Sequence, residues 1–171
     1  MGILVCGLNG SGKSTLGRAL AAALRLRFLD SEDLYFPDGR FDAPRTREEF
    51  LAALDAATRE GDFVFASVKG NAVQALHERI SLAIWVDVPR ETRLQRVRER
   101  SFRRFGERML PGGDLHAAEE KFFAQVASRS DEEMRAWAAQ LPWPVLRVDG
   151  TRPVQALVPE ICTWISETTG L

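Results

Sequence analysis

The chain has 171 residues, close to the roughly 100–150 residues of one ordinary domain. Apolar residues make up 45% and charged residues 27%, which excludes an intrinsically disordered chain. The net charge of -1 gives no overall electrostatic reason to expect binding to nucleic acid or to an anionic membrane. No apolar run approaches the roughly 18–20 residues that span a bilayer. We therefore expect a single domain over residues 1–171 that does not enter a membrane.

The two cysteines, Cys6 and Cys162, lie far apart in apolar runs and lack the spacing of a metal or redox motif. We expect both to be buried, reduced thiols. No basic segment precedes the apolar run 3–6, which leads directly into a glycine-rich loop, so we expect no signal peptide. A cytoplasmic location is the expectation, with no nucleic acid and no obligate protein partner.

Short apolar runs alternate with longer segments of helical periodicity along the chain. In chain order we expect a strand at 3–6, a helix over 16–24, a strand at 27–29 and a helix at 50–57. A strand at 63–68, a short helix to 76, a strand at 82–88 and a long helix from 90 follow. The last elements are helices at 115–129 and 131–140, a strand at 145–148 and a helix at 153–165. Asp131 is the expected N-cap of its helix. This order predicts an α/β fold with a parallel sheet, whose ligands bind beyond the carboxyl ends of the strands.

The segment from Gly7 to Ser14 fits the pattern GxxxxGK[ST] at every fixed position and lies between a strand and a helix. Its glycines let the backbone turn so that N–H groups point at phosphate oxygens, and the following helix adds its positive end. Lys13 is expected to reach the β- and γ-phosphates, and the Ser14 hydroxyl to coordinate Mg²⁺. The expected nucleotide contacts are Gly7, Asn9, Gly10, Ser11, Gly12, Lys13, Ser14 and Thr15.

Other classes of P-loop protein lack support in this sequence. A GTPase needs an N/T-K-x-D guanine signature, which is absent. Motor and transporter ATPases need an acid at the end of a strand beside the P-loop strand, and the run 63–68 ends without one. Asp87 does end a strand, but the chain is too short for the usual motor additions. These exclusions leave the small P-loop kinases.

The sequence resembles the group of shikimate kinases, gluconokinases and nucleoside monophosphate kinases. Besides the P-loop, the similar segments are Phe-Leu-Asp-Ser-Glu-Asp at 28–33, Ala-Ser-Val-Lys at 66–69, an Arg-rich segment after the fourth strand, and Val-Asp-Gly-Thr at 148–151. The resemblance implies a three-layer P-loop NTPase fold, with a five-stranded parallel sheet in the order 2-3-1-4-5 and helices on both faces. It also implies ATP and Mg²⁺ as cofactors, an Arg-rich lid near 101–114 and an acceptor-binding region near 31–60.

Two departures from the group prevent a substrate from being carried over. Lys69-Gly70-Asn71 stands where shikimate kinases carry a glycine triplet. The Asp-Gly-Phe-Pro-Arg segment of adenylate kinases is absent.

Two acidic residues after the second strand are candidates for chemistry. We expect Asp30 either to hold Mg²⁺ through water or to accept the substrate proton, and Asp33 to bind or deprotonate the acceptor hydroxyl. Glu32 is expected to face solvent. A structural reading competes, in which Asp30 or Ser31 caps a short helix whose positive end the following acids favour. Which carboxylate is the base stays open.

Eight arginines lie between residues 90 and 108. Because phosphoryl transfer develops charge on the γ-phosphate oxygens, we expect Arg100 and Arg104 to act in catalysis from a closing lid. Arg96 shares a helix face with Arg100. The competing reading is a solvated helix with pairs of opposite charge four residues apart. Three further arginines are expected at the surface: Arg90, Arg93 and Arg98.

Further cations are candidates for acceptor recognition, because they follow a strand or fall in the region where the group binds acceptors. A carboxylate or phosphate on the acceptor would pair with them. The expected substrate contacts are Asp33, Arg45, Lys69 and Arg129, with Arg47 as a neighbour of Arg45. Gly150 and Thr151 follow the last strand and are expected to contact the nucleotide through their backbone.

These observations predict a phosphotransferase that uses ATP and Mg²⁺ and moves the γ-phosphate to a small molecule bearing a hydroxyl or phosphate. Three alternatives stay open: a nucleoside monophosphate kinase, an antibiotic-modifying kinase, and a non-catalytic module that senses ATP. The small-molecule acceptor is the partner that the sequence implies.

Overall fold

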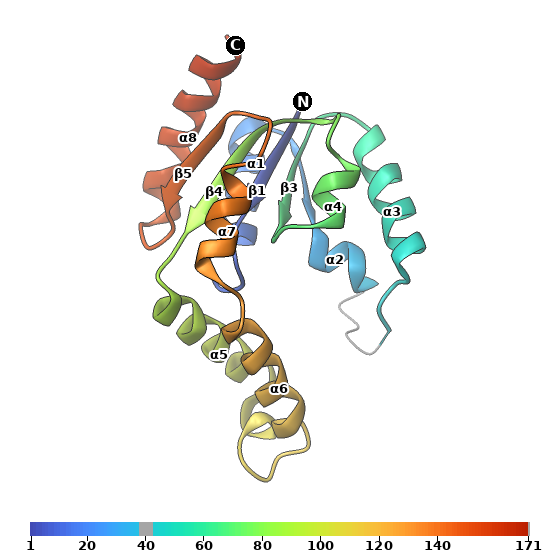
Figure 1. The fold of residues 1–171 in the computed structure, drawn as a ribbon, viewed down its shortest axis with the longest axis vertical. Helices are drawn as coiled ribbons and strands as arrows, with labels where there is room; N and C mark the ends of the chain where they lie inside the picture. The colour runs from blue at the N-terminus through green and yellow to red at the C-terminus, as the bar shows by residue number, and fades with distance from the viewer. Residues whose placement is uncertain (38–42, 171) are drawn as a thin grey trace.

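The computed structural model describes residues 1–37 and 43–170. Its five strands form one parallel sheet in the order β2-β3-β1-β4-β5, which confirms the expected order (Figure 1). The strands are β1 (Gly2–Cys6), β2 (Arg27–Asp30), β3 (Phe63–Ser67), β4 (Ile80–Asp87) and β5 (Val145–Asp149). The strand that leads into the P-loop therefore lies at the centre of the sheet.

Helices cover both faces of the sheet (Figure 1). They are α1 (Lys13–Leu24), α2 (Ser31–Tyr35), α3 (Arg47–Arg59), α4 (Asn71–Ala75), α5 (Arg90–Phe105), α6 (His116–Ala127), α7 (Asp131–Ala138) and α8 (Val154–Thr169), with a 3-10 helix, η2, at Gly106–Met109. Within residues 1–37 and 43–170, no helix is long and apolar enough to cross a bilayer.

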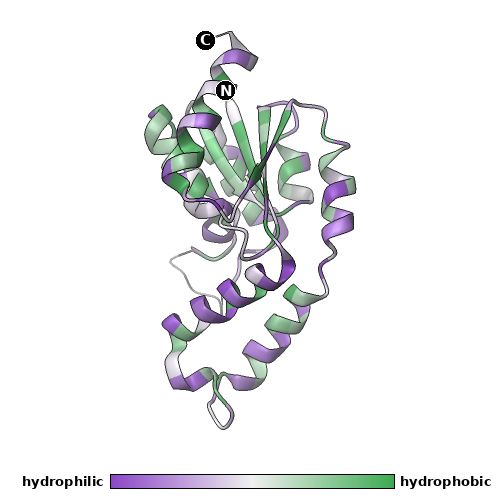
Figure 2. Ribbon diagram, turned by 90° about the vertical axis from the view of Figure 1, so that its left-hand side faces the viewer, coloured by the Kyte–Doolittle hydropathy of each residue, from purple (hydrophilic) through white to green (hydrophobic). Residues whose placement is uncertain are grey.

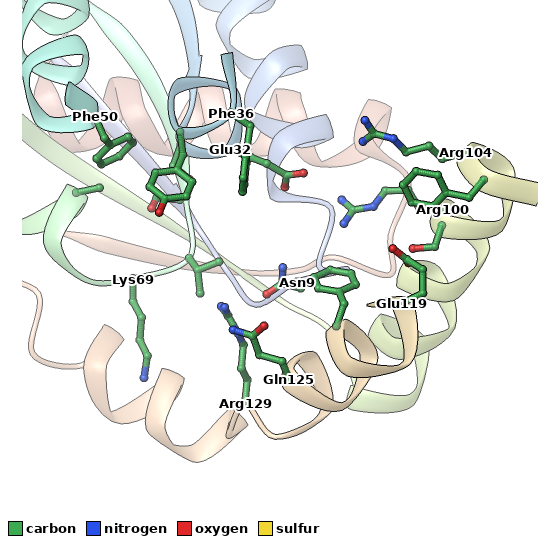
Figure 3. Close-up of a pocket in the computed structure, with 18 residues that line it drawn as sticks. Asn9, Glu32, Phe36, Phe50, Lys69, Arg100, Arg104, Glu119, Gln125 and Arg129 are labelled. Carbon is green, nitrogen blue, oxygen red and sulfur yellow. The ribbon is translucent and has the colours of Figure 1, made fainter. Parts of the chain in front are cut away.

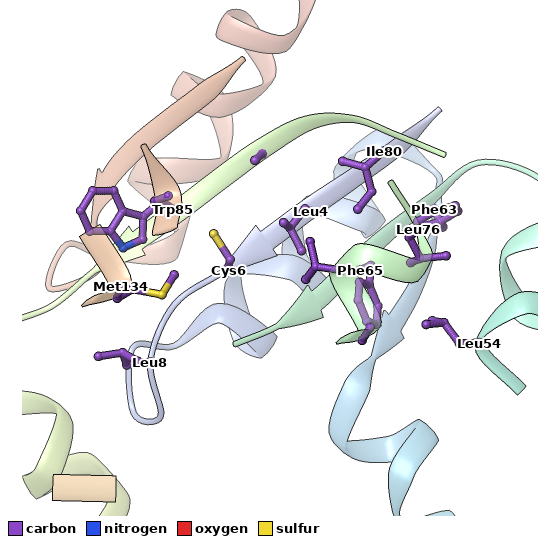
Figure 4. Packing of buried hydrophobic residues seen from close by; sticks show 14 of the residues in the cluster. Leu4, Cys6, Leu8, Leu54, Phe63, Phe65, Leu76, Ile80, Trp85 and Met134 are labelled. Atoms are coloured by element: carbon purple, nitrogen blue, oxygen red, sulfur yellow. The ribbon is translucent and has the colours of Figure 1, made fainter. Parts of the chain in front are cut away.

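The sheet is apolar on both faces because every residue of β1 and β3 is buried. Alternate residues along each strand pack against the helices on opposite faces of the sheet. Leu4 and Phe65 pair in register and pack towards α3, α4 and α7, as part of the cluster in Figure 4. Ile3 and Val64, one position earlier, pack against α1 and α8. The period of two along each strand thus builds two separate apolar layers around one sheet.

The helices α5 and α6, joined by η2, extend from the sheet at its carboxyl edge, and we call residues 90–127 the arm (Figure 1). Figure 2 shows the strands in the hydrophobic colour, whereas hydrophilic and hydrophobic stretches alternate along the arm. The arm has its own small core of Val97, Met109, Phe123 and Val126. It therefore folds around contacts that do not involve the sheet.

The expected lid near 101–114 is helical at its start. Helix α5 continues through Phe105, because Ser101 lies one turn after Val97 and both are buried on the same face. The helix ends where Gly106 adopts φ +57°. The irregular part of the expected lid is thus shorter than 101–114.

Three smaller expectations also need adjustment. Ser130, not Asp131, caps α7, since its hydroxyl accepts a hydrogen bond from the Glu133 N–H. Cys6 is buried as expected, but Cys162 is only half-buried. Residues 38–42 of the expected acceptor region lie outside the described residues.

Candidate active site

The carboxyl ends of three neighbouring strands bring the predicted site residues to one edge of the sheet. Cys6, at the end of β1, pairs with Ser67 of β3, and Asp30 of β2 pairs with Ala66. The residues that follow these positions are the P-loop, helix α2 and Lys69. The parallel register therefore assembles the candidate site from segments far apart in the sequence.

Two glycines of the P-loop adopt conformations that other residues disfavour. Gly10 has φ +82° and Gly12 has φ +89°. At Gly10 a Cβ atom would also lie 2.3 Å from the carbonyl oxygen of Arg93 on α5. Glycine is thus required at position 10 both by its backbone angle and by the close approach of α5.

The P-loop presents polar groups that have no partner among the described residues. No side chain caps the start of α1, and its first turn carries no acidic residue. Buried Asn9 Oδ1 and Ser11 Oγ make no hydrogen bond with any described residue. The free N–H groups of a helix start and polar side chains without partners are the groups that hold a phosphate. The loop therefore fits the triphosphate that its motif predicts.

Lys13 lies at the centre of the charged groups of the site. Burial lowers the pKa of its ammonium group, the carboxylates of Asp30 and Glu32 raise that pKa, and the guanidinium groups of Arg100 and Arg129 lower it. Two carboxylates and two arginines from α2, the arm and the segment after it thus lie close enough to act on one ammonium group.

Helix α2 decides which acidic side chain faces the site. Asp30 is its N-cap, and Oδ1 of Asp30 accepts a hydrogen bond from the Glu32 N–H at 2.9 Å, as the structural reading anticipated. Glu32 lines the pocket, so the expectation that it faces solvent is wrong. Asp33 does not line the pocket; its side chain is 74% exposed and lies 3.9 Å from Arg18. Consecutive helical residues point about 100° apart, so only one of the two faces the pocket.

A cavity of about 770 Å³ opens between α2, β3 and the arm (Figure 3). Four cationic residues line it: Lys69, Arg100, Arg104 and Arg129. The aromatic side chains of its wall are Tyr35, Phe36, Phe50, Phe105 and Phe122. Charged groups over an apolar wall are typical of a pocket for a small polar molecule.

The expected acceptor-binding cations divide between the pocket and the outside. Lys69 Nζ lies 3.3 Å from Oε2 of Glu133 at the pocket wall. Arg129 is half-buried, burial lowers the pKa of its guanidinium group, and no described carboxylate pairs with it. Arg45 does not line the pocket, since its guanidinium group donates to the carbonyl of Leu34 and holds the end of α2.

The segment after β5 packs against the P-loop. At Gly150 a Cβ atom would lie 2.9 Å from the carbonyl oxygen of Ser11, so this residue approaches the loop closely. Thr151 is directed away, because its N–H and hydroxyl both donate to Oδ1 of Asp149. Arg96 Nη1 donates to the Gly150 carbonyl at 3.0 Å. Sequence reasoning did not select Arg96, although it lies one helical turn before Arg100.

Arg93 is a second residue that sequence reasoning missed. It was expected at the surface, but its side chain is 2% exposed. Its guanidinium group donates to the carbonyls of Val88 at 3.2 Å and Asn9 at 3.4 Å and pairs with Asp131. The position of Arg93 four residues before buried Val97 is the signal that could have placed it inside.

No group of three or more His, Cys, Asp or Glu side chains suited to a metal ion occurs among the residues that the structure describes. The site therefore offers Mg²⁺ few protein ligands. This is the situation expected where a metal is held mainly by phosphates and water.

Comparison with known proteins gives consistent findings. The family described as "AAA domain" matches residues 3–108. The uncharacterized protein YqaC of Bacillus subtilis is 28% identical, covering 96% of this chain and 97% of its own length. A shikimate kinase of Symbiobacterium thermophilum is 34% identical, covering 74% and 83%. The structure of a shikimate kinase from Acinetobacter baumannii in complex with shikimate shares the fold, with a TM-score of 0.61, 19% identity and coverage of 97% and 93%.

Proposed function

We propose a specific reaction for this chain, which belongs to the AAA domain family and, within it, to the small P-loop kinases of the shikimate kinase group. It is an ATP-dependent small-molecule kinase, and we propose that it transfers the γ-phosphate of ATP to a hydroxyl group of a small acceptor in the presence of Mg²⁺. The observation that carries this proposal is that Asp30, Glu32, Arg100 and Arg129 all lie close enough to Lys13 to influence its pKa, and that Glu32, Arg100 and Arg129 also line the pocket.

The P-loop would hold the triphosphate through its backbone N–H groups, with Lys13 beside the β- and γ-phosphates. The Ser14 hydroxyl would be the protein ligand of Mg²⁺, and Asp30 would hold a water of the hydrated ion with the carboxylate oxygen that does not cap α2. Mg²⁺ bound there would neutralise part of the negative charge of the phosphates. Arg96, beside Gly150 and above the P-loop, would flank the nucleotide base.

Glu32 is the residue we assign to the acceptor hydroxyl. It lines the pocket and lies close enough to Lys13 to influence its pKa, so a hydroxyl bound between them would face the γ-phosphate. A carboxylate there orients the hydroxyl and accepts its proton as the new bond forms. Arg100 and Arg129 would stabilise the charge that develops on the transferred group.

We assign the arm the role of a lid. Arg100 and Arg104 lie on it and line the pocket, so its approach to the sheet would bring both towards the phosphate. Such an approach would also exclude water, which competes with the acceptor for the phosphoryl group.

The test is ADP release from Mg-ATP with separate acceptor pools and a water-only control. The pools are nucleoside monophosphates, sugar acids, neutral polyols, and amino sugars including aminoglycosides. We expect one pool to raise the rate well above water, and Lys13→Ala to abolish the increase with an unchanged circular dichroism spectrum. Equal rates in all pools and in water, with ATP binding retained, would exclude phosphoryl transfer to these acceptors.

A further inference from the structure

Glu119 is a charged residue of the pocket that the proposed phosphoryl transfer does not use. It lies in the first turn of α6 and lines the cavity with Arg104 and Phe105. Its Oε2 is buried, and no described residue donates a hydrogen bond to it. In Figure 3 its carboxylate points into the pocket from the arm. A buried carboxylate oxygen without a hydrogen-bond donor lowers the stability of the protein. We therefore expect a bound ligand to supply that donor.

Glu120, the next residue on α6, is a glutamate at the surface with an ion pair. The side chain of Glu120 is 50% exposed, and its Oε1 lies 3.7 Å from Nη1 of Arg98. Glu119 has no ion pair with any residue that the structure describes. The two neighbours therefore share side-chain chemistry and lie on the same helix, but their surroundings differ.

Two glutamates line the cavity besides its four cationic residues. Glu32 faces it from α2 and Glu119 from α6. Two of the pocket cations, Arg100 and Arg129, lie close enough to Lys13 to act on its pKa, which is the phosphate side. Lys69 pairs with Glu133. Arg104 is the fourth cation of the lining, and the cavity wall also holds the rings of Phe105 and Phe122.

An ionised carboxylate only accepts hydrogen bonds, so its ligand must donate. We propose that Glu119 binds an ammonium or hydroxyl group of the phosphoryl acceptor and excludes acceptors that carry a carboxylate at this position. The inference rests on the proposed function, since it assigns the cavity to the acceptor. The substrate class that it names is a compact amino alcohol, amino sugar or polyol, and hydroxy acids such as shikimate are disfavoured by charge repulsion.

The test measures binding separately from turnover. The whole protein, with Mg²⁺ and a non-hydrolysable ATP analogue, is exposed to three pools: amino alcohols and amino sugars, neutral polyols and sugars, and hydroxy acids including shikimate and gluconate. Binding is followed as the rise in the midpoint of thermal unfolding and then as the Kd of the best compound. The first two pools distinguish an ammonium ligand from a hydroxyl ligand.

We expect a pool without carboxylates to give the largest rise. Glu119→Gln keeps the shape and removes the charge, so the Kd should increase about 10- to 100-fold. The same variant should bind hydroxy acids more tightly than the wild type, a gain that a structural role would not produce. Its unfolding midpoint without ligand should be equal or higher, because a buried charge is lost. Glu120→Gln is the matched control and should behave as the wild type.

Three results would overturn the inference: a preference of the wild type for hydroxy acids, unchanged binding of the other pools by Glu119→Gln, or no rise with any pool. The proposed function is judged by ADP release in the same mixtures. Binding that depends on Glu119 without ADP release would refute phosphoryl transfer to the bound compound and leave Glu119 as a ligand-binding residue only.

Discussion

At the scale of single residues, Glu32 and Asp33 are adjacent acids with different surroundings. Glu32 lines the pocket, whereas the Asp33 side chain is 74% exposed beside Arg18. We predict that Glu32→Gln lowers kcat about 100-fold or more, because the acceptor hydroxyl loses its base. Steady-state kinetics with the best acceptor measures this.

The matched control is Asp33→Asn, which removes a carboxylate from the same turn of α2. We expect its kcat within about twofold of the wild type, since exposed ion pairs contribute little. A larger loss in Asp33→Asn than in Glu32→Gln would restore the assignment that the sequence alone suggested.

Cys6 shows how burial of one side chain affects alkaline stability. Burial raises the pKa of its thiol from 9.0 to about 12. In the unfolded chain the thiol ionises above pH 9, whereas the folded protein retains the proton until about pH 12. The folded state thus binds more protons in this window, so the contribution of Cys6 to stability is complete below pH 9 and is lost between pH 9 and about 12.

We predict that Cys6→Ala reduces the alkaline loss of stability. Between pH 9 and 11 the wild type should lose up to about 1.4 kcal/mol per pH unit more than the variant. Urea denaturation at several pH values gives both slopes. Equal slopes would mean that Cys6 ionises alike in the folded and unfolded chain.

At the scale of elements, Arg93 connects three segments that meet under the P-loop. It lies on α5, donates to the carbonyl of Asn9 in the loop, and pairs with Asp131 at the start of α7. The segment between α6 and α7 carries Arg129, only two residues from Asp131. We infer that Arg93 positions both the phosphate loop and Arg129.

We predict that Arg93→Met lowers the free energy of unfolding by about 2–4 kcal/mol, because a buried ion pair loses one partner. It should also raise the KM for ATP, which loss of stability alone does not explain in protein that is still folded. Arg98→Met is the control, since Arg98 is 58% exposed, and should change stability by at most about 1 kcal/mol. Similar losses in the two variants would remove the special role of Arg93.

Element by element, the sequence predicted best what is local. The P-loop is contiguous, so its glycines, Lys13 and Ser14 could be assigned from spacing alone. The face of α2 that points to the site could not be assigned in this way, because a helix of five residues is too short to show helical periodicity in the sequence. The choice between Glu32 and Asp33 depends on where β2 directs the chain.

At the scale of the whole molecule, the alternating apolar runs predicted a parallel sheet, and the family resemblance supplied the order of its strands. The pocket was not predictable in the same way, since α2, β3, α5 and α6 each contribute to it. Arg93 looked like a surface arginine because its partner Asp131 lies 38 residues away. Burial of a charge is a property of the assembled fold.

The arm holds a core of its own, built from Val97, Met109, Phe123 and Val126. Mutations that remodel its inner surface, including position 119, therefore need not disturb the apolar layers on either face of the sheet. We therefore expect the outer part of the arm to tolerate exchange between relatives, provided that Arg93, which donates to the Asn9 carbonyl of the P-loop, is kept.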